Sequence, residues 1–97
     1  MYDAKNSQIK FYDDTINYVS FGYGKKNLVL IPGLNTERIK GKALQFAFYY
    51  RNFLREYKVF IFDHKEHLNE NYEINDMVEE IAYCIKKLNL DKVDVVG

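Results

Sequence analysis

Short apolar runs and longer amphipathic segments follow one another along the 97 residues of this chain. Apolar and polar positions alternate over Gln8–Tyr12, Ile16–Phe21 gives a second strand, and turn-forming residues fill the gap between the two runs. This pattern predicts an antiparallel β-hairpin, with Ile9 and Phe11 on one face of its first strand. The residues before the first run are polar and show no period, which predicts a frayed end.

The next run, Leu28–Ile31, is apolar without interruption and stops at Pro32-Gly33. A short continuous apolar run bounded by turn residues is typical of a strand buried on both faces, as in a parallel sheet. Proline cannot donate to a strand ladder and glycine tolerates unusual backbone angles, so the strand should end abruptly there. The loop that follows lies at the carboxyl end of the strand, where open α/β sheets place their ligands.

A helical period begins at residue 41 and predicts a helix over 41–56. Its apolar positions recur at steps of three and four: Ala43, Phe46, Ala47, Tyr50, Phe53, Leu54 and Tyr57. Arg51 and Arg55 fall off this stripe and are predicted to face solvent. The pattern indicates a helix packed on the sheet; the alternative is an aromatic binding face built from Phe46, Tyr49, Tyr50 and Phe53.

A further strand, Lys58–Phe62, and a second helical stripe complete the pattern. The apolar positions of the second stripe are Ile74, Met77, Val78, Ile81, Ile85 and Leu88, and the residues predicted to lie outside it are Glu79, Glu80, Lys86 and Lys87. Asn89 is a plausible stop, and Val93–Gly97 begins another strand. The order β-β-β-α-β-α-β predicts an α/β fold in which a hairpin precedes parallel strands joined by crossover helices.

Composition narrows the class of protein. An apolar content of 47% fits one small globular domain, and the 14 basic residues balance the 14 acidic ones. Without a basic surplus, the sequence predicts no nucleic-acid or membrane partner. It contains no apolar segment of spanning length and no signal peptide. The single cysteine, Cys84, excludes an internal disulfide and fits a cytoplasmic location.

Few side chains offer catalytic chemistry. Asp63 and His64 are neighbours on a predicted strand and should point to opposite faces, which argues against an acid–base pair. His64-Lys65-Glu66-His67 has a loose metal-ligand spacing, but a charged loop predicts a solvated segment instead. Cys84 is expected to be a small buried hydrophobe, and Ser20 and Thr36 have no base at a useful spacing. No metal and no cofactor is predicted.

Four segments, taken in order, resemble the amino-terminal half of an α/β-hydrolase. They are Ile16–Gly22, Leu28–Leu34, the pair Asp76-Met77 at the start of a helix, and Val93–Gly97. The resemblance covers residues 8–97 and rests on the order of the segments rather than on one specific motif. It implies that residues 1–97 form a single partial domain, the amino-terminal part of an α/β-hydrolase core.

The resemblance also implies the parts of a hydrolase site. Gly97 matches the first glycine of the nucleophile elbow Gly-x-Ser-x-Gly, so the nucleophile, the acid and the histidine would all follow it. The loop Pro32-Gly33-Leu34-Asn35 matches the family's oxyanion loop, with the Leu34 backbone N–H as donor. Proline replaces the usual histidine, and Ile74 stands where relatives carry a helix-capping Ser or Thr, so Asn75 is the expected cap.

Two functions of different classes follow. The first is the amino-terminal fragment of an ester or acyl hydrolase, inactive alone, whose small-molecule substrate the sequence does not identify. The alternative is a small flavodoxin-like binding module that uses the Pro32–Asn35 loop for an anionic ligand, although that loop lacks the lysine of a P-loop. If the strand order resembles that of the α/β-hydrolases, the last strand presents an open edge, which predicts self-association.

Overall fold

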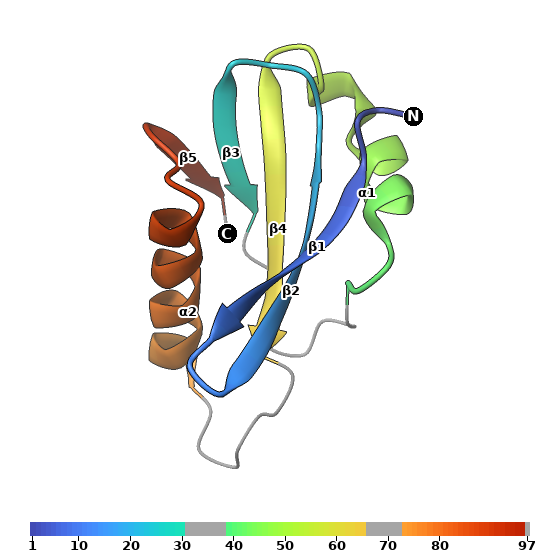
Figure 1. Cartoon of the computed structure of the whole chain (residues 1–97). Helices are drawn as coiled ribbons and strands as arrows, with labels where there is room; N and C mark the ends of the chain where they lie inside the picture. Colours follow the sequence, from blue (N-terminus) through green and yellow to red (C-terminus); the bar gives the residue numbers. More distant parts are fainter. Residues whose placement is uncertain (31–38, 66–72, 97) are drawn as a thin grey trace.

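The computed structural model describes residues 1–30, 39–65 and 73–96. Within them a five-stranded sheet carries one helix on each face (Figure 1). The elements in chain order are β1 (Lys5–Phe11), β2 (Asp14–Phe21), β3 (Lys26–Leu30), α1 (Ala43–Tyr49), a 3-10 turn (Arg51–Phe53), β4 (Tyr57–Lys65), α2 (Ile74–Lys87) and β5 (Val93–Val96). The α/β class and the order of strands and helices predicted from the sequence are confirmed.

The strands lie in the order β1-β2-β4-β3-β5. β2 is antiparallel to both of its neighbours, whereas β3 is parallel to β4 and to β5. Val29 of β3 lies opposite Phe60 on one side and Val95 on the other. β3 is therefore an interior strand of a parallel segment, as its uninterrupted apolar run predicts, and the middle position of the sheet belongs to β4.

Two hydrophobic cores lie on the two faces of the sheet. Alternate residues of β4 supply both, because Phe60 and Phe62 face α2 while Val59 and Ile61 face α1. The buried members of the α2 core are Ile9, Ile16, Val29, Phe60, Phe62, Met77, Ile81 and Cys84. Those of the α1 core are Val19, Phe21, Ile39, Ala43, Ala47, Leu54, Val59 and Ile61. Burial on both sides explains why β4 is apolar without alternation.

β1 begins at Lys5, three residues earlier than the sequence predicts, so the predicted frayed end is partly wrong. Lys5 pairs with Ser20, and the Gly22 N–H donates to the Tyr2 carbonyl at 2.9 Å. The Asn6 side-chain oxygen accepts the Ala43 N–H at 2.9 Å. Polar residues can extend this strand because main-chain pairing with β2 holds it at the edge of the sheet.

α1 is shorter than the predicted helix over 41–56. It ends at Tyr49, and Tyr50 leads into the 3-10 turn, which brings Leu54 back into the core with 3% of its surface exposed. Phe53 leaves the predicted stripe and is 50% exposed. The periodicity could not show this break, because a tightened turn shifts the phase of the residues that follow it.

The ends of α2 match the predicted stop but not the predicted cap. At its start, the Glu73 N–H donates to the Asp76 carboxylate at 2.8 Å, as in a capping box, so the cap is Glu73 and not Asn75. At its end, Asn89 adopts a left-handed φ of 56° and the Leu90 N–H donates to the Ile85 carbonyl at 3.1 Å. This Schellman arrangement confirms Asn89 as the stop.

The buried face of α2 is rotated relative to the predicted stripe. Met77, Ile81 and Cys84 are buried, Val78 is 52% exposed, and Glu80, predicted to face solvent, is only 3% exposed. Burial raises the pKa of the Cys84 thiol to about 12, and the Glu80 carboxylate one turn earlier adds to this shift. At neutral pH the thiol is therefore protonated and unreactive, which confirms Cys84 as a small buried hydrophobe.

Candidate functional site

The carboxyl ends of β3, β4 and β5 lie along one edge of the sheet (Figure 1). Leu30 at the end of β3 pairs with Ile61 and with Val96, and β4 continues from Ile61 to Lys65. The carboxyl ends of parallel strands mark the side of the sheet where open α/β folds bind ligands, and here β4 extends four residues past the end of β3. The predicted site loop leaves the sheet at this edge.

The residues predicted for the site lie outside the described parts of the chain. Pro32, Gly33, Leu34 and Asn35 fall between Leu30 and Ile39, and Gly97 follows the last described residue. The oxyanion donor and the start of the nucleophile elbow therefore stay predictions. What the structure does describe is the point where the chain leaves the sheet, at the end of β3, and the point where it returns, at Ile39.

The Asp63 carboxylate holds the chain at Ile39, where it returns to the sheet after β3. One oxygen of its carboxylate accepts the Ile39 N–H at 3.1 Å, and the other accepts the His64 N–H at 2.7 Å. Asp63 is 5% exposed and Ile39 is 1% exposed, so both bonds lie in the interior, where a lost acceptor would not be replaced by water. Asp63 thus joins the end of β4 to the segment that enters α1.

Sequence reasoning considered Asp63 only as half of an acid–base pair with His64 and missed this role. The sequence feature that could have indicated this role is an aspartate directly after a buried apolar run. A carboxylate in such a position is shielded from water, so backbone N–H groups must bind it. Asp63 lies on the α1 side of the sheet with Ile39. The pairing of β4 with β2 is irregular here, because its register shifts between Ile16 and Tyr18 and leaves Asp63 and His64 together opposite Asn17. His64 is buried too, with 3% of its surface exposed. The expected separation of the two side chains stays a prediction, because regular alternation does not hold across a shift in register.

Other candidate groups do not assemble into a site within the described residues. Those residues contain no group of three His, Cys, Asp or Glu side chains that could hold a metal, and part of the His64–His67 cluster lies outside them. Ser20 is 5% exposed and inaccessible to a substrate, while Thr36 is not described.

A hollow of about 300 Å³ lies on the α1 side, beside the point where the chain returns. Asn6, Gln8, Asn17, Lys40 and Gly41 are among its lining residues. Ser7 and Tyr18 also line it, and these groups can donate and accept hydrogen bonds. The hollow could hold a small polar molecule, and it offers no catalytic machinery of its own.

Comparison with known proteins identifies the fold. No protein-family model matches the sequence, and no curated protein does so. Solved structures do match. A bromoperoxidase from Bacillus anthracis matches with a TM-score of 0.73 and 23% identity, and the matched region covers 96% of this chain and 34% of the bromoperoxidase chain. A membrane phospholipase A matches with a TM-score of 0.75, 15% identity and coverage of 96% and 31%. The epoxide hydrolase CorEH matches with a TM-score of 0.71, 19% identity and coverage of 97% and 33%.

These structures share the α/β-hydrolase fold, and the chain has that fold over nearly all of its length. The chain spans about a third of the length of the solved structures that it matches. The resemblance drawn from the order of four sequence segments is therefore confirmed at the level of fold.

Proposed function

We propose that residues 1–97 form the amino-terminal part of an α/β-hydrolase that acts on an ester or another acyl compound of small size. The observation that supports this most strongly is the match to hydrolase-fold structures over 96% of the chain, with β3, β4 and β5 in parallel at the ligand-binding edge. A flavodoxin-like binding module fits less well, because β1 and β2 form an antiparallel hairpin in front of the parallel strands.

In this proposal the Leu34 N–H is the oxyanion donor of the loop that contains Pro32, Gly33 and Asn35. A backbone donor requires a fixed main chain and makes no demand on the side chain. The two hydrogen bonds of Asp63 support the assignment, since they fix the backbone at Ile39, five residues after Leu34. Gly97 would then be the first glycine of the nucleophile elbow, two positions before the nucleophile.

The isolated chain is expected to be inactive. Its serines are Ser7 and Ser20, and neither stands in a Gly-x-Ser-x-Gly segment. An oxyanion donor without a nucleophile gives little turnover. We further propose that the protein acts in the cytoplasm, without a metal, a cofactor or a nucleic-acid partner. The part of the chain that the structure describes contains no helix long and apolar enough to cross a membrane.

The test compares the 97-residue chain with the product of the reading frame extended beyond Gly97. We expect the longer protein to hydrolyse p-nitrophenyl esters and to react with a fluorophosphonate at a serine two residues after Gly97, and the shorter one to do neither. In the longer protein, Leu34→Pro removes the N–H and should lower kcat by about 10²–10³-fold. Leu34→Ala keeps the N–H and is the matched control. Equal kcat values for the two variants would reject Leu34 as the donor.

We also propose that the 97-residue chain self-associates through β5. Within the described residues β5 pairs with β3 alone, and Val95 and Val96 are 52% and 50% exposed. An open strand edge flanked by apolar side chains recruits further strands. Light scattering over a dilution series should show a mass that falls on dilution, and Val95→Lys should shift the chain toward monomer. A dilution-insensitive monomer would contradict this proposal.

A further inference from the structure

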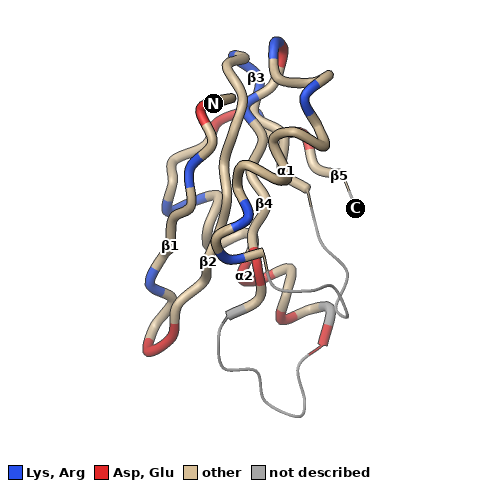
Figure 2. The backbone as a smooth tube through the Cα atoms, turned by 90° about the vertical axis from the view of Figure 1, so that its right-hand side faces the viewer, with Lys and Arg blue, Asp and Glu red and all other residues tan. Residues whose placement is uncertain are grey.

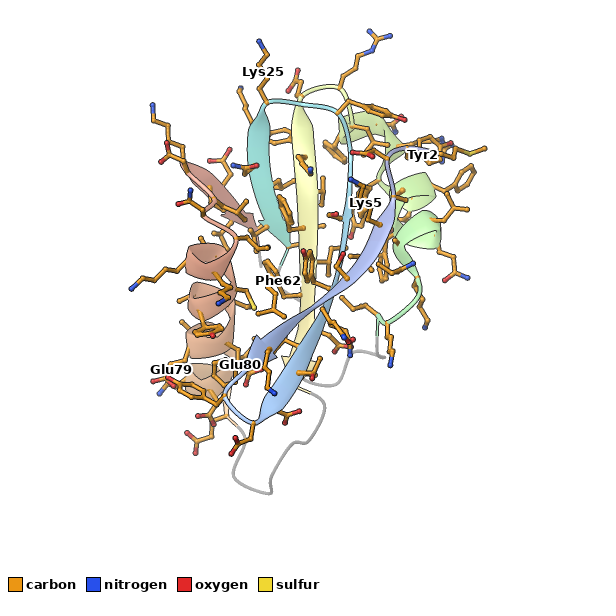
Figure 3. The ribbon with its side chains drawn as sticks, viewed as in Figure 1. Tyr2, Lys5, Lys25, Phe62, Glu79 and Glu80 are labelled. Carbon is orange, nitrogen blue, oxygen red and sulfur yellow. The ribbon has the colours of Figure 1, made fainter. Side chains whose placement is uncertain are left out.

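Large apolar side chains are exposed around α1. Leu44 and Phe48, four residues apart on one side of the helix, are 51% and 57% exposed, and Met1 beside them is 87% exposed. Together with Tyr2 they line a pocket of about 420 Å³. Figure 3 shows Tyr2 beside α1, at the amino-terminal end of the chain. We name Met1, Tyr2, Leu44 and Phe48 the α1 apolar patch.

The small and large side chains of α1 are distributed in an unusual way. α1 buries Ala43 and Ala47 against the sheet and packs Phe46 partly against the same core, while Leu44 and Phe48 face outward. Hydrophobic burial within this chain alone would favour the larger side chains on the inner face. A contiguous exposed apolar patch marks an interaction site. The outer face of α1 is therefore built to contact something outside the described chain.

The segment that carries α1 is rich in positive charge, although the acidic Asp3 follows the patch residues Met1 and Tyr2. Between residues 39 and 55 the chain carries Lys40, Lys42, Arg51 and Arg55 and no acidic residue. The Arg51 guanidinium lies 4.3 Å from the centre of the Phe48 ring, and it also donates to the Phe48 carbonyl at 2.9 Å. Cationic and apolar groups are thus in direct contact at the edge of the α1 apolar patch.

The charge balance of the whole chain hides this local excess. Figure 2 shows Lys and Arg on the ribbon that leads into and out of α1, and Asp and Glu along the early part of α2. Glu79 and Glu80 lie on α2, on the opposite side of the sheet from α1 (Figure 3). The neutral total of 14 basic and 14 acidic residues therefore includes a local excess of basic residues in the segment that carries α1.

We propose that the α1 apolar patch docks on the surface of an anionic lipid bilayer. Leu44, Phe48 and Met1 would enter the boundary between headgroups and acyl chains, with the Arg51 guanidinium on the phosphates. Peripheral segments bind bilayers through this combination of apolar area and Lys or Arg. The charge of the rim favours an anionic lipid over a neutral protein surface. Such docking requires no spanning helix and does not depend on the proposed hydrolase activity.

A single fluorophore can report on insertion, because the chain contains no tryptophan. Phe48→Trp should show a blue shift of its emission with vesicles of phosphatidylcholine and phosphatidylglycerol in equal parts, and none with phosphatidylcholine alone. Tyr12→Trp, in the β1–β2 turn and 77% exposed, is the matched control and should show no shift with either vesicle. Added salt should weaken the binding, because it screens the cations.

Flotation of the full chain with the same vesicles tests which groups carry the binding. The double variant Leu44→Ser, Phe48→Ser and the single variant Arg51→Glu should each lower the partition coefficient about tenfold or more. Val78→Ser removes an equally exposed apolar side chain from α2 and should leave binding unchanged. Circular dichroism should show each variant folded, since all these side chains are exposed.

The opposite results would overturn the proposal. These results are equal binding to the anionic and the neutral vesicles, or no binding to either. A third is a loss of binding in Val78→Ser as large as that in the double variant Leu44→Ser, Phe48→Ser. If the double variant still binds vesicles but abolishes the self-association seen by light scattering, the patch is a protein interface. Because these readouts need no turnover, failure of lipid docking is distinct from failure of the proposed hydrolase function.

Discussion

Gly24→Ala is expected to prevent the chain from folding, whereas Gly41→Ala should cost only about 1–2 kcal/mol of stability. A Cβ atom on Gly24 would overlap the backbone of Glu56. The backbone there cannot easily move, because the Gly24 N–H donates to the Tyr57 carbonyl at 3.4 Å and the Lys26 N–H donates to the Glu56 carbonyl at 3.2 Å. These bonds hold the start of β3 against the start of β4.

Gly41 is the matched control because it separates backbone strain from overlap. Its φ of 77° disfavours a side chain, but a Cβ there would meet no atom within 4 Å. Gly22 combines both penalties, with a φ of 106° and a Cβ that would overlap the Tyr57 carbonyl. Chemical denaturation followed by far-ultraviolet circular dichroism would rank the variants. A cooperative Gly24→Ala transition within 1 kcal/mol of Gly41→Ala would contradict this account of the β3–β4 junction.

The sequence predicted those parts of the fold that depend on local periodicity. Alternation marked β1, the short turn after it marked a hairpin with β2, and an uninterrupted apolar run marked β3 as an interior parallel strand. The helical period located α2, and Asn89 marked its end through a conformation that asparagine tolerates. Each of these features is specified by residues that lie close together in the chain, so a reader of the sequence could recover them.

The errors arise where distant residues decide the outcome. α1 ends early because the 3-10 turn returns Leu54 to the core, where the Leu54 carbonyl accepts the Tyr23 N–H at 2.8 Å. Glu80 is buried because α2 presents Met77, Ile81 and Cys84 to the sheet. A stripe of apolar residues gives the approximate direction of a helix face, but the packing of the whole helix sets its final rotation.

The candidate site shows the same division between local and long-range information. The apolar run that stops at Pro32-Gly33 predicted a site loop at the carboxyl end of β3, and this stays a prediction because the loop lies outside the described residues. The residue that fixes the loop's return, Asp63, could not be predicted in that role, because its partner Ile39 is 24 residues earlier in the chain. The helix and strand periods relate only residues a few positions apart, so they could not reveal a contact over this distance.

Asp63→Ala is expected to destabilise the chain by about 2–4 kcal/mol, since two interior backbone donors would lose their acceptor. These donors are the Ile39 and His64 N–H groups, now 3.1 Å and 2.7 Å from the carboxylate oxygens. Asp63→Asn keeps one oxygen and the side-chain volume, so it should cost less than Asp63→Ala. Urea denaturation would give the three stabilities, and hydrogen exchange at the Ile39 amide would locate the change.

Asp94→Ala is the control, because Asp94 is an exposed aspartate on β5 and its loss should change stability by less than about 0.5 kcal/mol. If Asp63→Ala costs no more than Asp94→Ala, the carboxylate does not hold the returning segment. If Asp63→Ala is costly and the Ile39 amide loses its protection before the rest of the sheet does, the hydrogen bond is the local tie between β4 and the entry to α1. A buried carboxylate that orders backbone in this way makes the returning end of the proposed oxyanion loop rigid before any substrate binds.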